Sequence, residues 1–166
     1  MSDYTTVFGS LDQYEKGRLE IIDDDPRHYA FSNVFEVASQ AQPYEKIAVA
    51  KNLEYVVEVI RTEGTSDWFT CAHDEFAVVL DGQVEIHLVK LDDPRSVLAD
   101  DAHGAVRVSG APIGRKMGRM KLRRGHQALL PEGAAYQFVA EQPGVILLQT
   151  LKGELTIEKW ADVCQA

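Results

Sequence analysis

Three side chains that could perform acid–base or metal chemistry alternate along one short stretch of the sequence: Cys71, His73 and Glu75. Alternate residues of an extended strand point to the same face, so these side chains can converge. A thiolate, an imidazole and a carboxylate all bind transition metals, and an enclosed carboxylate can also act as a general acid or base. The stretch therefore predicts a site for metal ligation or for proton transfer.

A second candidate is Tyr136, which begins a strand after the Pro-Glu-Gly turn at residues 131–133. Pro131 restricts φ and Gly133 can adopt conformations closed to other residues, so the chain reverses there. If Tyr136 faces Glu75, its phenol could donate a proton or stabilise charge during a reaction. Alternatively, it could hydrogen-bond to Glu75 and simply hold the fold together.

The elements that must position these residues are short apolar stretches rich in Val, Ile, Phe and Tyr, separated by glycines and prolines. Such stretches favour β-strands, so the predicted fold class is all-β. The dipeptide Asp81-Gly82 predicts a hairpin, with residues 75–80 and 83–90 as antiparallel neighbours. Further strands are expected at residues 55–60, 128–130 and 144–151.

The remaining segments connect or flank these strands. Residues 91–114 are acidic and then rich in small residues, which favours a long loop. The first 45 residues are expected to form an arm with a short strand at residues 33–37. The spacing of apolar residues from Leu155 to Cys164 predicts a short terminal helix that docks Trp160.

A basic stretch at residues 115–124 holds six of the seventeen Lys and Arg residues. Alternation would turn Met120 and Leu122 toward the core and the basic side chains away from it. One interpretation is a solvated outer strand that balances the acidic arm. The other is a face that attracts a carboxylate substrate or an acidic partner.

Composition limits the class of protein. The chain has 166 residues, enough for one domain, and a formal net charge of −9, which disfavours nucleic acids and anionic membranes as partners. It has no apolar run of the roughly 18 to 20 residues that a membrane span needs. Its two cysteines, Cys71 and Cys164, are too few for a disulfide framework. We therefore expect a cytoplasmic protein.

Two spaced motifs resemble the signatures of the cupin superfamily. In the second signature, Gly125, Pro131 and Gly133 fall at the expected spacing, and Tyr136 stands at the position of a metal-binding histidine. The match to the first signature is EFAVVLDG, which runs from Glu75 to Gly82.

The histidines of the first cupin signature are also replaced. Counting back from Glu75 places Cys71 and Phe69 at the two histidine positions. A cupin metal is usually held by three imidazoles and one carboxylate, and of these only Glu75 remains. His73, Glu75 and Tyr136, with or without Cys71, are the residues left that could bind iron or another divalent metal. The alternative is that His73 caps a turn and no metal binds.

The resemblance implies an RmlC-like jelly roll at residues 46–152, between an N-terminal arm (1–45) and a C-terminal segment (153–166), and a homodimer. It also implies a small-molecule enzyme with an aromatic or carboxylated ligand inside the barrel. With a metal, dioxygenase-type ring cleavage is expected, and without one, an isomerase or lyase that uses Glu75 and Tyr136. A non-catalytic binding protein, or an accessory subunit of a partner oxygenase, is the third possibility. The residues expected to contact a ligand are Phe69, Cys71 and Phe138.

Overall fold

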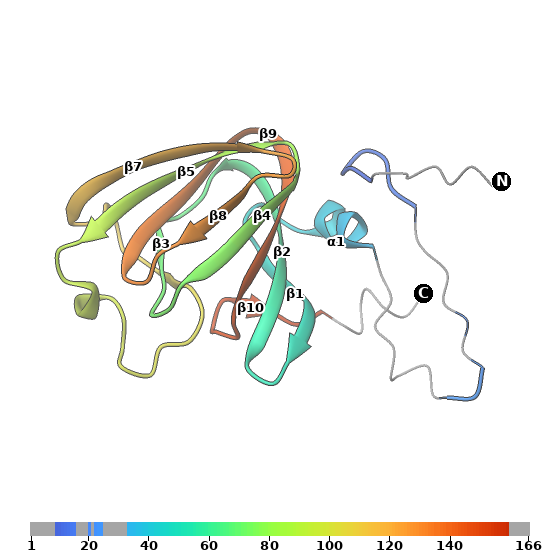
Figure 1. Cartoon of the computed structure of the whole chain (residues 1–166), viewed down its shortest axis with the longest axis horizontal. Coiled ribbons are helices and arrows are strands. Elements are labelled where there is room, and N and C mark those ends of the chain that lie inside the picture. Colours follow the sequence, from blue (N-terminus) through green and yellow to red (C-terminus); the bar gives the residue numbers. More distant parts are fainter. Residues whose placement is uncertain (1–8, 16–19, 21, 25–32, 160–166) are drawn as a thin grey trace.

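The computed structural model describes residues 9–15, 20, 22–24 and 33–159, which form a curled ten-stranded sheet with a short helix against its outer face (Figure 1). The predicted all-β class is confirmed. The predicted positions of Trp160 and Cys164 lie outside the described residues. The elements are α1 (Val34–Gln40), β1 (Lys46–Asn52), β2 (Tyr55–Thr65), β3 (Phe69–Thr70), β4 (Glu75–Asp81), β5 (Gln83–Leu91), η2 (Pro94–Ser96), β6 (Val106–Arg107), β7 (Gly114–Arg123), β8 (Gln127–Leu130), β9 (Ala134–Leu151) and β10 (Thr156–Ile157).

Strand β9 connects the two halves of the curled sheet. Its first half pairs with β5, and its second half pairs with β2 and β4 (Figure 1). Its inward side chains, which include Tyr136, Phe138 and Leu148, belong to the main hydrophobic core. The strand therefore presents residues from both halves of the sheet to one enclosed interior.

The hairpin predicted at Asp81-Gly82 is wrong. Strand β4 pairs with β8 and β9, whereas β5 pairs with β7 and β9, so the two strands lie on different halves of the sheet. At this crossing Gly82 has φ +74, and a Cβ atom on it would lie 2.8 Å from Cα of Gly144. Gly82 therefore permits a close crossing against β9 and not a two-residue hairpin turn.

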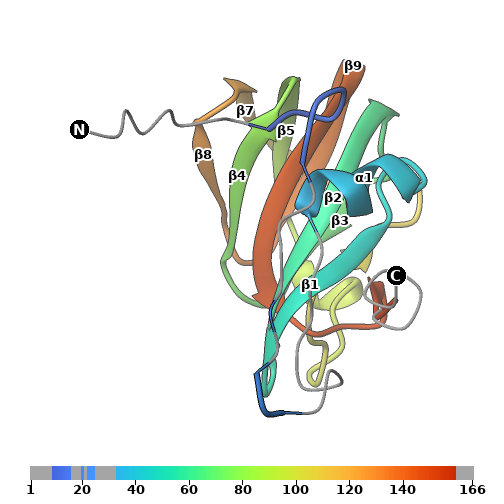
Figure 2. The ribbon, with the colours of Figure 1, turned by 90° about the vertical axis from the view of Figure 1, so that its right-hand side faces the viewer.

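The strand predicted at residues 33–37 is also wrong, because this segment begins helix α1. The side chain of Asn33 caps the helix by accepting a hydrogen bond from the backbone N–H of Phe35 at 2.9 Å. Val37, Ala38 and Ala41 then pack against outward residues of the sheet. Figure 2 shows α1 lying along the sheet beside β1 and β2. The helical spacing of these buried residues, and not strand alternation, decides the structure.

The C-terminal segment differs from its prediction as well. Thr156–Ile157, within the expected helix, form strand β10, which pairs in parallel with β1. The hydroxyl of Thr156 accepts a hydrogen bond from the N–H of Gly153 and donates one to Glu58. These contacts hold the segment in an extended conformation beside Lys46 and Ile47, the first two residues of β1.

The loop predicted at residues 91–114 and the side-chain directions predicted for the basic stretch at residues 115–124 agree with the structure. Residues 91–114 form mostly loop, interrupted by η2 and by β6, which has only two residues. Met120 and Leu122 of β7 pack against the main core, and the basic residues of that strand are exposed. Among the described residues, no helix has the length and apolar character that crossing a bilayer requires.

Candidate functional site

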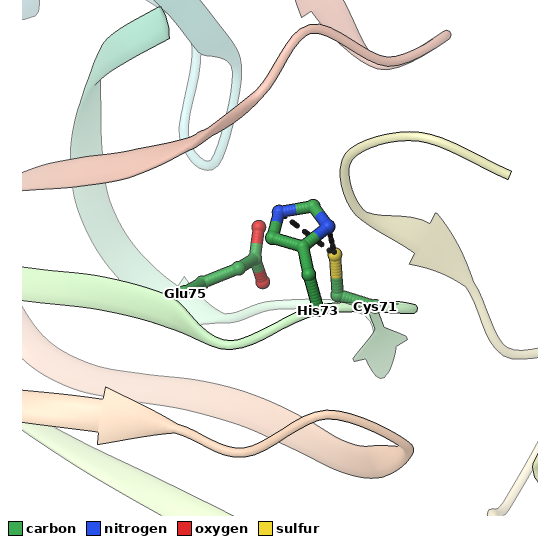
Figure 3. A group of neighbouring side chains, drawn as sticks. All are labelled: Cys71, His73 and Glu75. Carbon is green, nitrogen blue, oxygen red and sulfur yellow. Dashed lines mark hydrogen bonds between the residues drawn. The ribbon is translucent and has the colours of Figure 1, made fainter. Parts of the chain in front are cut away.

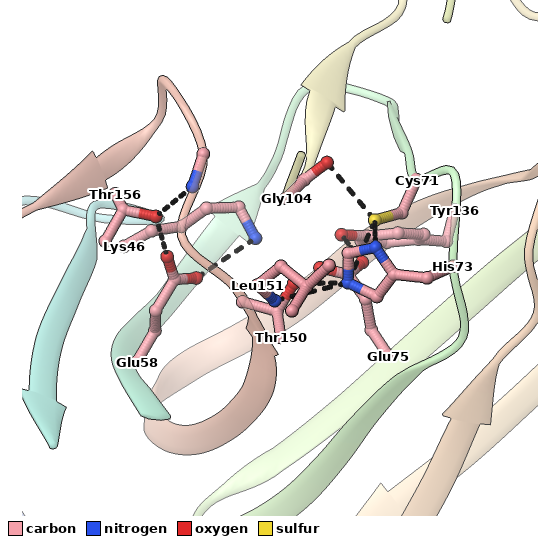
Figure 4. A network of polar contacts seen from close by, with 11 residues as sticks. Lys46, Glu58, Cys71, His73, Glu75, Gly104, Tyr136, Thr150, Leu151 and Thr156 are labelled. Atoms are coloured by element: carbon pink, nitrogen blue, oxygen red, sulfur yellow. Dashed lines mark hydrogen bonds and ion pairs between the residues drawn. The ribbon is translucent and has the colours of Figure 1, made fainter. Parts of the chain in front are cut away.

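The structure brings Glu75 and Tyr136 together inside the curled sheet. Glu75 begins β4 and Tyr136 lies on the first half of β9, and the two side chains meet across the interior (Figure 4). The hydroxyl of Tyr136 donates a hydrogen bond to Oε2 of Glu75 at 2.5 Å. Glu75 is 0% exposed and Tyr136 is 1% exposed. The contact is therefore completely enclosed.

The phenol of Tyr136 is held in its neutral form. Burial raises its pKa well above 10, and the negative charge of Glu75 and the hydrogen bond to it raise the pKa further. Tyr136 is therefore a permanent hydrogen-bond donor near neutral pH. The other oxygen of Glu75, Oε1, has no hydrogen-bond partner among the described residues.

Cys71 and His73 form a second polar group beside Glu75 (Figure 3). Sγ of Cys71 lies 3.2 Å from Nδ1 of His73 and donates to the carbonyl oxygen of Gly104 at 3.1 Å. The backbone N–H of Leu151 donates to Nε2 of His73 at 3.2 Å, and the hydroxyl of Thr150 lies 3.0 Å from the same nitrogen. Since Nε2 accepts, the proton of a neutral ring is on Nδ1, where it points toward the sulfur.

The thiol of Cys71 keeps its proton. Burial raises its pKa to about 12, and the negative charge of Glu75 acts in the same direction. The thiolate is the form that attacks electrophiles, so this thiol is a poor nucleophile near neutral pH. In this structure Cys71 is a small buried side chain that donates to the carbonyl of Gly104 and lies within hydrogen-bond distance of Nδ1 of His73.

The predicted metal ligands do converge, because ligand atoms of Cys71, His73 and Glu75 all lie within 4.8 Å of one another. Most of these ligand atoms are nevertheless already engaged, and Oε1 of Glu75 is the exception. Nε2 of His73 accepts from the backbone of β9, the thiol keeps its proton, and one oxygen of Glu75 accepts from Tyr136. These residues therefore do not fit a cupin-type metal centre.

The sequence analysis missed a buried ion pair next to this group. Lys46 begins β1 and Glu58 lies on β2, and their side chains are 3% and 1% exposed. Nζ of Lys46 is 3.9 Å from Oε2 of Glu58, and the other oxygen of Glu58 accepts from Thr156 at 2.7 Å (Figure 4). A signal was available in the sequence, because each charge stands within or beside an apolar run (KIAVA and YVVEVI).

The pair is incompletely hydrogen-bonded. Neither Nζ of Lys46 nor Oε2 of Glu58 has a hydrogen-bond partner among the described residues. Burial raises the pKa of Glu58, and the positive charge of Lys46 opposes that rise. Polar groups that are buried without partners cost free energy, so this place in the interior favours water or a polar ligand.

The residues expected to contact a ligand lie in the wall of the interior. Phe69 and Tyr136 have ring centroids 5.8 Å apart, and Phe138 meets Tyr136 edge to face at 5.4 Å. Phe69, Cys71 and Phe138 are all buried. Their contact with a ligand stays a prediction.

A cavity of about 410 Å³ lies outside this wall, beside the first residues of β1. We call it the Lys46 cavity, because Lys46 and Phe69 line it together with residues of β10 and of the segments around β3. Cys71, Glu75 and Tyr136 are not among its lining residues.

We compared the chain with known proteins. It is 58% identical to a chain in the crystal structure of hydroquinone 1,2-dioxygenase from Sphingomonas sp. TTNP3 with 4-hydroxybenzoate bound, with 99% of each chain covered and a TM-score of 0.94. It is 53% identical to a chain of hydroquinone 1,2-dioxygenase PnpCD in complex with Cd²⁺ and 4-hydroxybenzonitrile, with 98% of each covered and a TM-score of 0.91. No protein-family model and no curated protein matches the chain.

The chain also shares its fold with a longer chain of the Sphingomonas sp. TTNP3 enzyme, in a crystal structure with 4-nitrophenol. There the identity is 11% and the TM-score is 0.60, and 81% of this chain covers 36% of the longer one. Crystal structures of one enzyme thus contain a chain of matching length and a longer chain with a region of the same fold. The cupin fold expected from the two sequence motifs is confirmed.

Proposed function

Because the chain belongs to the family of cupin chains found in hydroquinone 1,2-dioxygenases, we propose that it is the shorter subunit of a dioxygenase that opens the ring of a hydroquinone. In this proposal a longer cupin-containing chain holds the metal and the reacting ring. The observation that carries the proposal is the 58% identity along 99% of both chains.

The presence of chains of two lengths in one enzyme supports an accessory role. The longer chain of the Sphingomonas sp. TTNP3 enzyme contains a region with the fold of this chain at only 11% identity. Two copies of one fold with so little identity can have different tasks, since function depends on the site and not on the fold. We therefore assign assembly and support to the shorter copy.

The interior of this chain supports the same division. Its carboxylate is bonded to Tyr136, its imidazole accepts from the backbone of Leu151, and its thiol is neutral. These groups form two separate hydrogen-bonded sets, Glu75 with Tyr136 and Cys71 with His73, and Oε1 of Glu75 has no partner among the described residues. A cupin metal is usually held by three imidazoles and one carboxylate, whereas this interior offers one imidazole, and its Nε2 already accepts from Leu151.

A metal-free isomerase or lyase that uses Glu75 and Tyr136 has less support. Both residues are fully buried, they are bonded to each other, and they are absent from the lining of the Lys46 cavity. A general acid or base must lie within hydrogen-bond reach of its substrate. Neither residue has that access in this structure.

The test is reconstitution with the longer chain of the Sphingomonas sp. TTNP3 enzyme. Each chain is purified alone and mixed with the other, light scattering during size-exclusion chromatography gives the mass of each species, and oxygen uptake with hydroquinone gives the turnover. Metal analysis is made on each separated chain. We expect a mixed complex, turnover that depends on it, and iron that follows the longer chain.

Two results would contradict the proposal. One is turnover of hydroquinone by the shorter chain alone, with one metal ion bound to each chain. The other is full activity of the longer chain with no gain in rate or stability from the shorter one. The same mass measurement on the shorter chain alone tests the expected homodimer.

A further inference from the structure

Strand β7 lies at a border of the sheet, beside β5 (Figure 1). Its ten residues, Gly114–Arg123, pair with β5 along one side, and no strand of the described residues pairs with the other side. Eight of the ten residues are exposed and two are half-buried. An unpaired strand presents a row of backbone N–H and C=O groups to which another strand can add. We call this unpaired side of residues 114–123 the β7 edge.

The β7 edge is basic, although the chain as a whole has a formal net charge of −9. The stretch at residues 115–124 contains six Lys and Arg side chains. Glu85 of β5 forms ion pairs with two of them, with Arg119 at 3.3 Å and with Lys121 at 2.8 Å. A single carboxylate therefore faces two cations, and positive charge remains on this part of the strand.

Three of the other basic side chains have no ion-pair partner among the described residues: Arg115, Lys116 and Arg123. Lysine on an exposed edge commonly serves to repel other strands. Arginine and methionine, in contrast, are enriched in interfaces between proteins, and this edge carries Met117, which is 47% exposed, among its arginines. The composition therefore favours an edge that pairs within a complex.

The charges select the kind of strand that can pair there. If two copies of β7 paired antiparallel about Arg119, this residue would lie opposite its own copy, and Arg115 would lie opposite Arg123. Like charges directly opposite each other destabilise a strand pair, so a second copy of this chain is disfavoured. An extended segment with carboxylates at alternate positions has the complementary charge.

We propose that the β7 edge binds the longer chain of the dioxygenase by adding an extended acidic segment of that chain to the sheet. Backbone hydrogen bonds supply affinity, and carboxylates of the added segment pair with Arg115, Lys116 and Arg123. Glu75, Tyr136 and the Lys46 cavity take no part in this contact. The inference rests on the proposed function, because its partner is the longer chain.

The experiment measures binding of the longer chain of the Sphingomonas sp. TTNP3 enzyme by biolayer interferometry. The triple variant Arg115→Glu/Lys116→Glu/Arg123→Glu reverses the three unpaired charges and leaves the ion pairs of Glu85 in place. We expect it to bind the longer chain at least about tenfold more weakly than the unmodified chain, because each added carboxylate repels the acidic segment.

A matched control separates this surface from the net charge of the chain. It reverses three exposed basic side chains outside β7, in the variant Lys51→Glu/Arg95→Glu/Lys152→Glu. Both triple variants change the net charge equally, so the control should keep the affinity of the unmodified chain to within about twofold. Circular dichroism spectra and melting temperatures show whether each variant is folded.

Hydrogen exchange measured by mass spectrometry distinguishes an added strand from charge attraction alone. Amides of residues 114–123 that do not bond to β5 should exchange rapidly in the free chain. In the complex they should exchange at least about tenfold more slowly, because they then donate to the added segment. Attraction between side chains alone would leave their exchange unchanged.

Three results would overturn the inference: equal affinity of the folded β7 variant and the unmodified chain, unchanged exchange of residues 114–123 in the complex, or a dimer of the shorter chain alone that protects these same amides. If the unmodified chain forms no complex with the longer chain, the proposed function is contradicted, and the inference fails with it. The two failures are distinguishable, because the complex of the unmodified chain forms in one case and not in the other.

Discussion

Tyr136 and Glu75 are 61 positions apart in the sequence, and the hydroxyl of one donates to the carboxylate of the other at 2.5 Å in the buried interior. The bond joins the first half of β9 to the beginning of β4. Those strands pair through the second half of β9, so this side-chain contact closes the interior from the opposite side. We therefore expect the hydrogen bond between Tyr136 and Glu75 to stabilise the fold.

We expect Tyr136→Phe to lower the free energy of unfolding by about 1–3 kcal/mol, because it leaves a buried carboxylate without its hydrogen-bond donor. Urea denaturation followed by circular dichroism measures the change. Tyr55→Phe is the control, since Tyr55 is exposed. Unchanged stability of Tyr136→Phe together with lost turnover of the two-chain complex would instead indicate a chemical role.

The thiol of Cys71 should be unreactive in the folded chain. We expect a Cys164→Ser variant, in which Cys71 is the remaining cysteine, to react with a disulfide reagent at pH 8 only at the rate of unfolding. Absorbance of the released thiol follows the reaction, and added urea should accelerate it steeply. Immediate stoichiometric labelling without denaturant would contradict the burial of this side chain.

The same thiol should affect stability at alkaline pH. Its pKa is raised from 9.0 to about 12 in the folded chain, so the folded state keeps a proton that the unfolded state loses. Stability is therefore fully present below pH 9 and falls as the pH rises from there toward 12. Denaturation curves at several pH values should show a shallower decline for Cys71→Ala than for the unmodified chain. Parallel declines would contradict this assignment.

The buried pair of Lys46 and Glu58 should be coupled. Lys46→Met leaves a buried carboxylate without its cation, and we expect the free energy of unfolding to fall by about 3 kcal/mol. Lys46→Met/Glu58→Gln should recover a large part of this loss, because no charge is then left unpaired. A double-mutant cycle by urea denaturation measures the coupling, and additive effects would contradict it.

The pH dependence of Lys46→Met provides a second measurement. Burial raises the pKa of Glu58 above 4.5, and removal of the Lys46 charge takes away the contribution that opposes this rise. A group with a raised folded pKa stabilises the fold below its unfolded pKa and loses this effect as the pH rises. The destabilisation caused by Lys46→Met should therefore be smaller near pH 4 than at pH 8.

Glu85 should act in the opposite direction on the outer surface. Hydrogen bonds from Lys121 and His87 lower its pKa to about 2, so it stabilises the fold above pH 4.5 and loses that effect as the pH falls toward 2. Glu85→Gln should lower the melting temperature slightly at pH 7 and have no effect near pH 2. Added salt should reduce the difference at pH 7, because the ion pairs are exposed to solvent. Glu54→Gln, which has no ion-pair partner among the described residues, is the control.

Local patterns in the sequence predicted much of the fold. The turn at Pro131 and Gly133 placed Tyr136 on the strand that follows. The side chains of Cys71, His73 and Glu75 do converge, but residues 71–74 form a bend between β3 and β4 and not the extended strand from which the shared face was predicted. The alternation at Met120 and Leu122 predicted their contact with the core. The predictions for Tyr136, Met120 and Leu122 succeed because the direction of a side chain within a strand depends only on its neighbours in the chain.

The predictions that fail depend on contacts between distant segments. The Asp81-Gly82 dipeptide is locally compatible with a hairpin, but β4 and β5 each pair with a different part of β9. In the same way, Asn33 and its apolar neighbours form a helix because the outer face of the sheet offers a surface to cover.

By itself, the sequence determined the all-β class and the cupin resemblance. Only the tertiary structure decided that Nε2 of His73 accepts from Leu151, that Tyr136 bonds to Glu75, and that Lys46 is buried beside Glu58. The physical reason is that side-chain type and alternation are local properties. The partner of a polar atom, and its exposure to solvent, are set by strands that the chain brings together from distant positions.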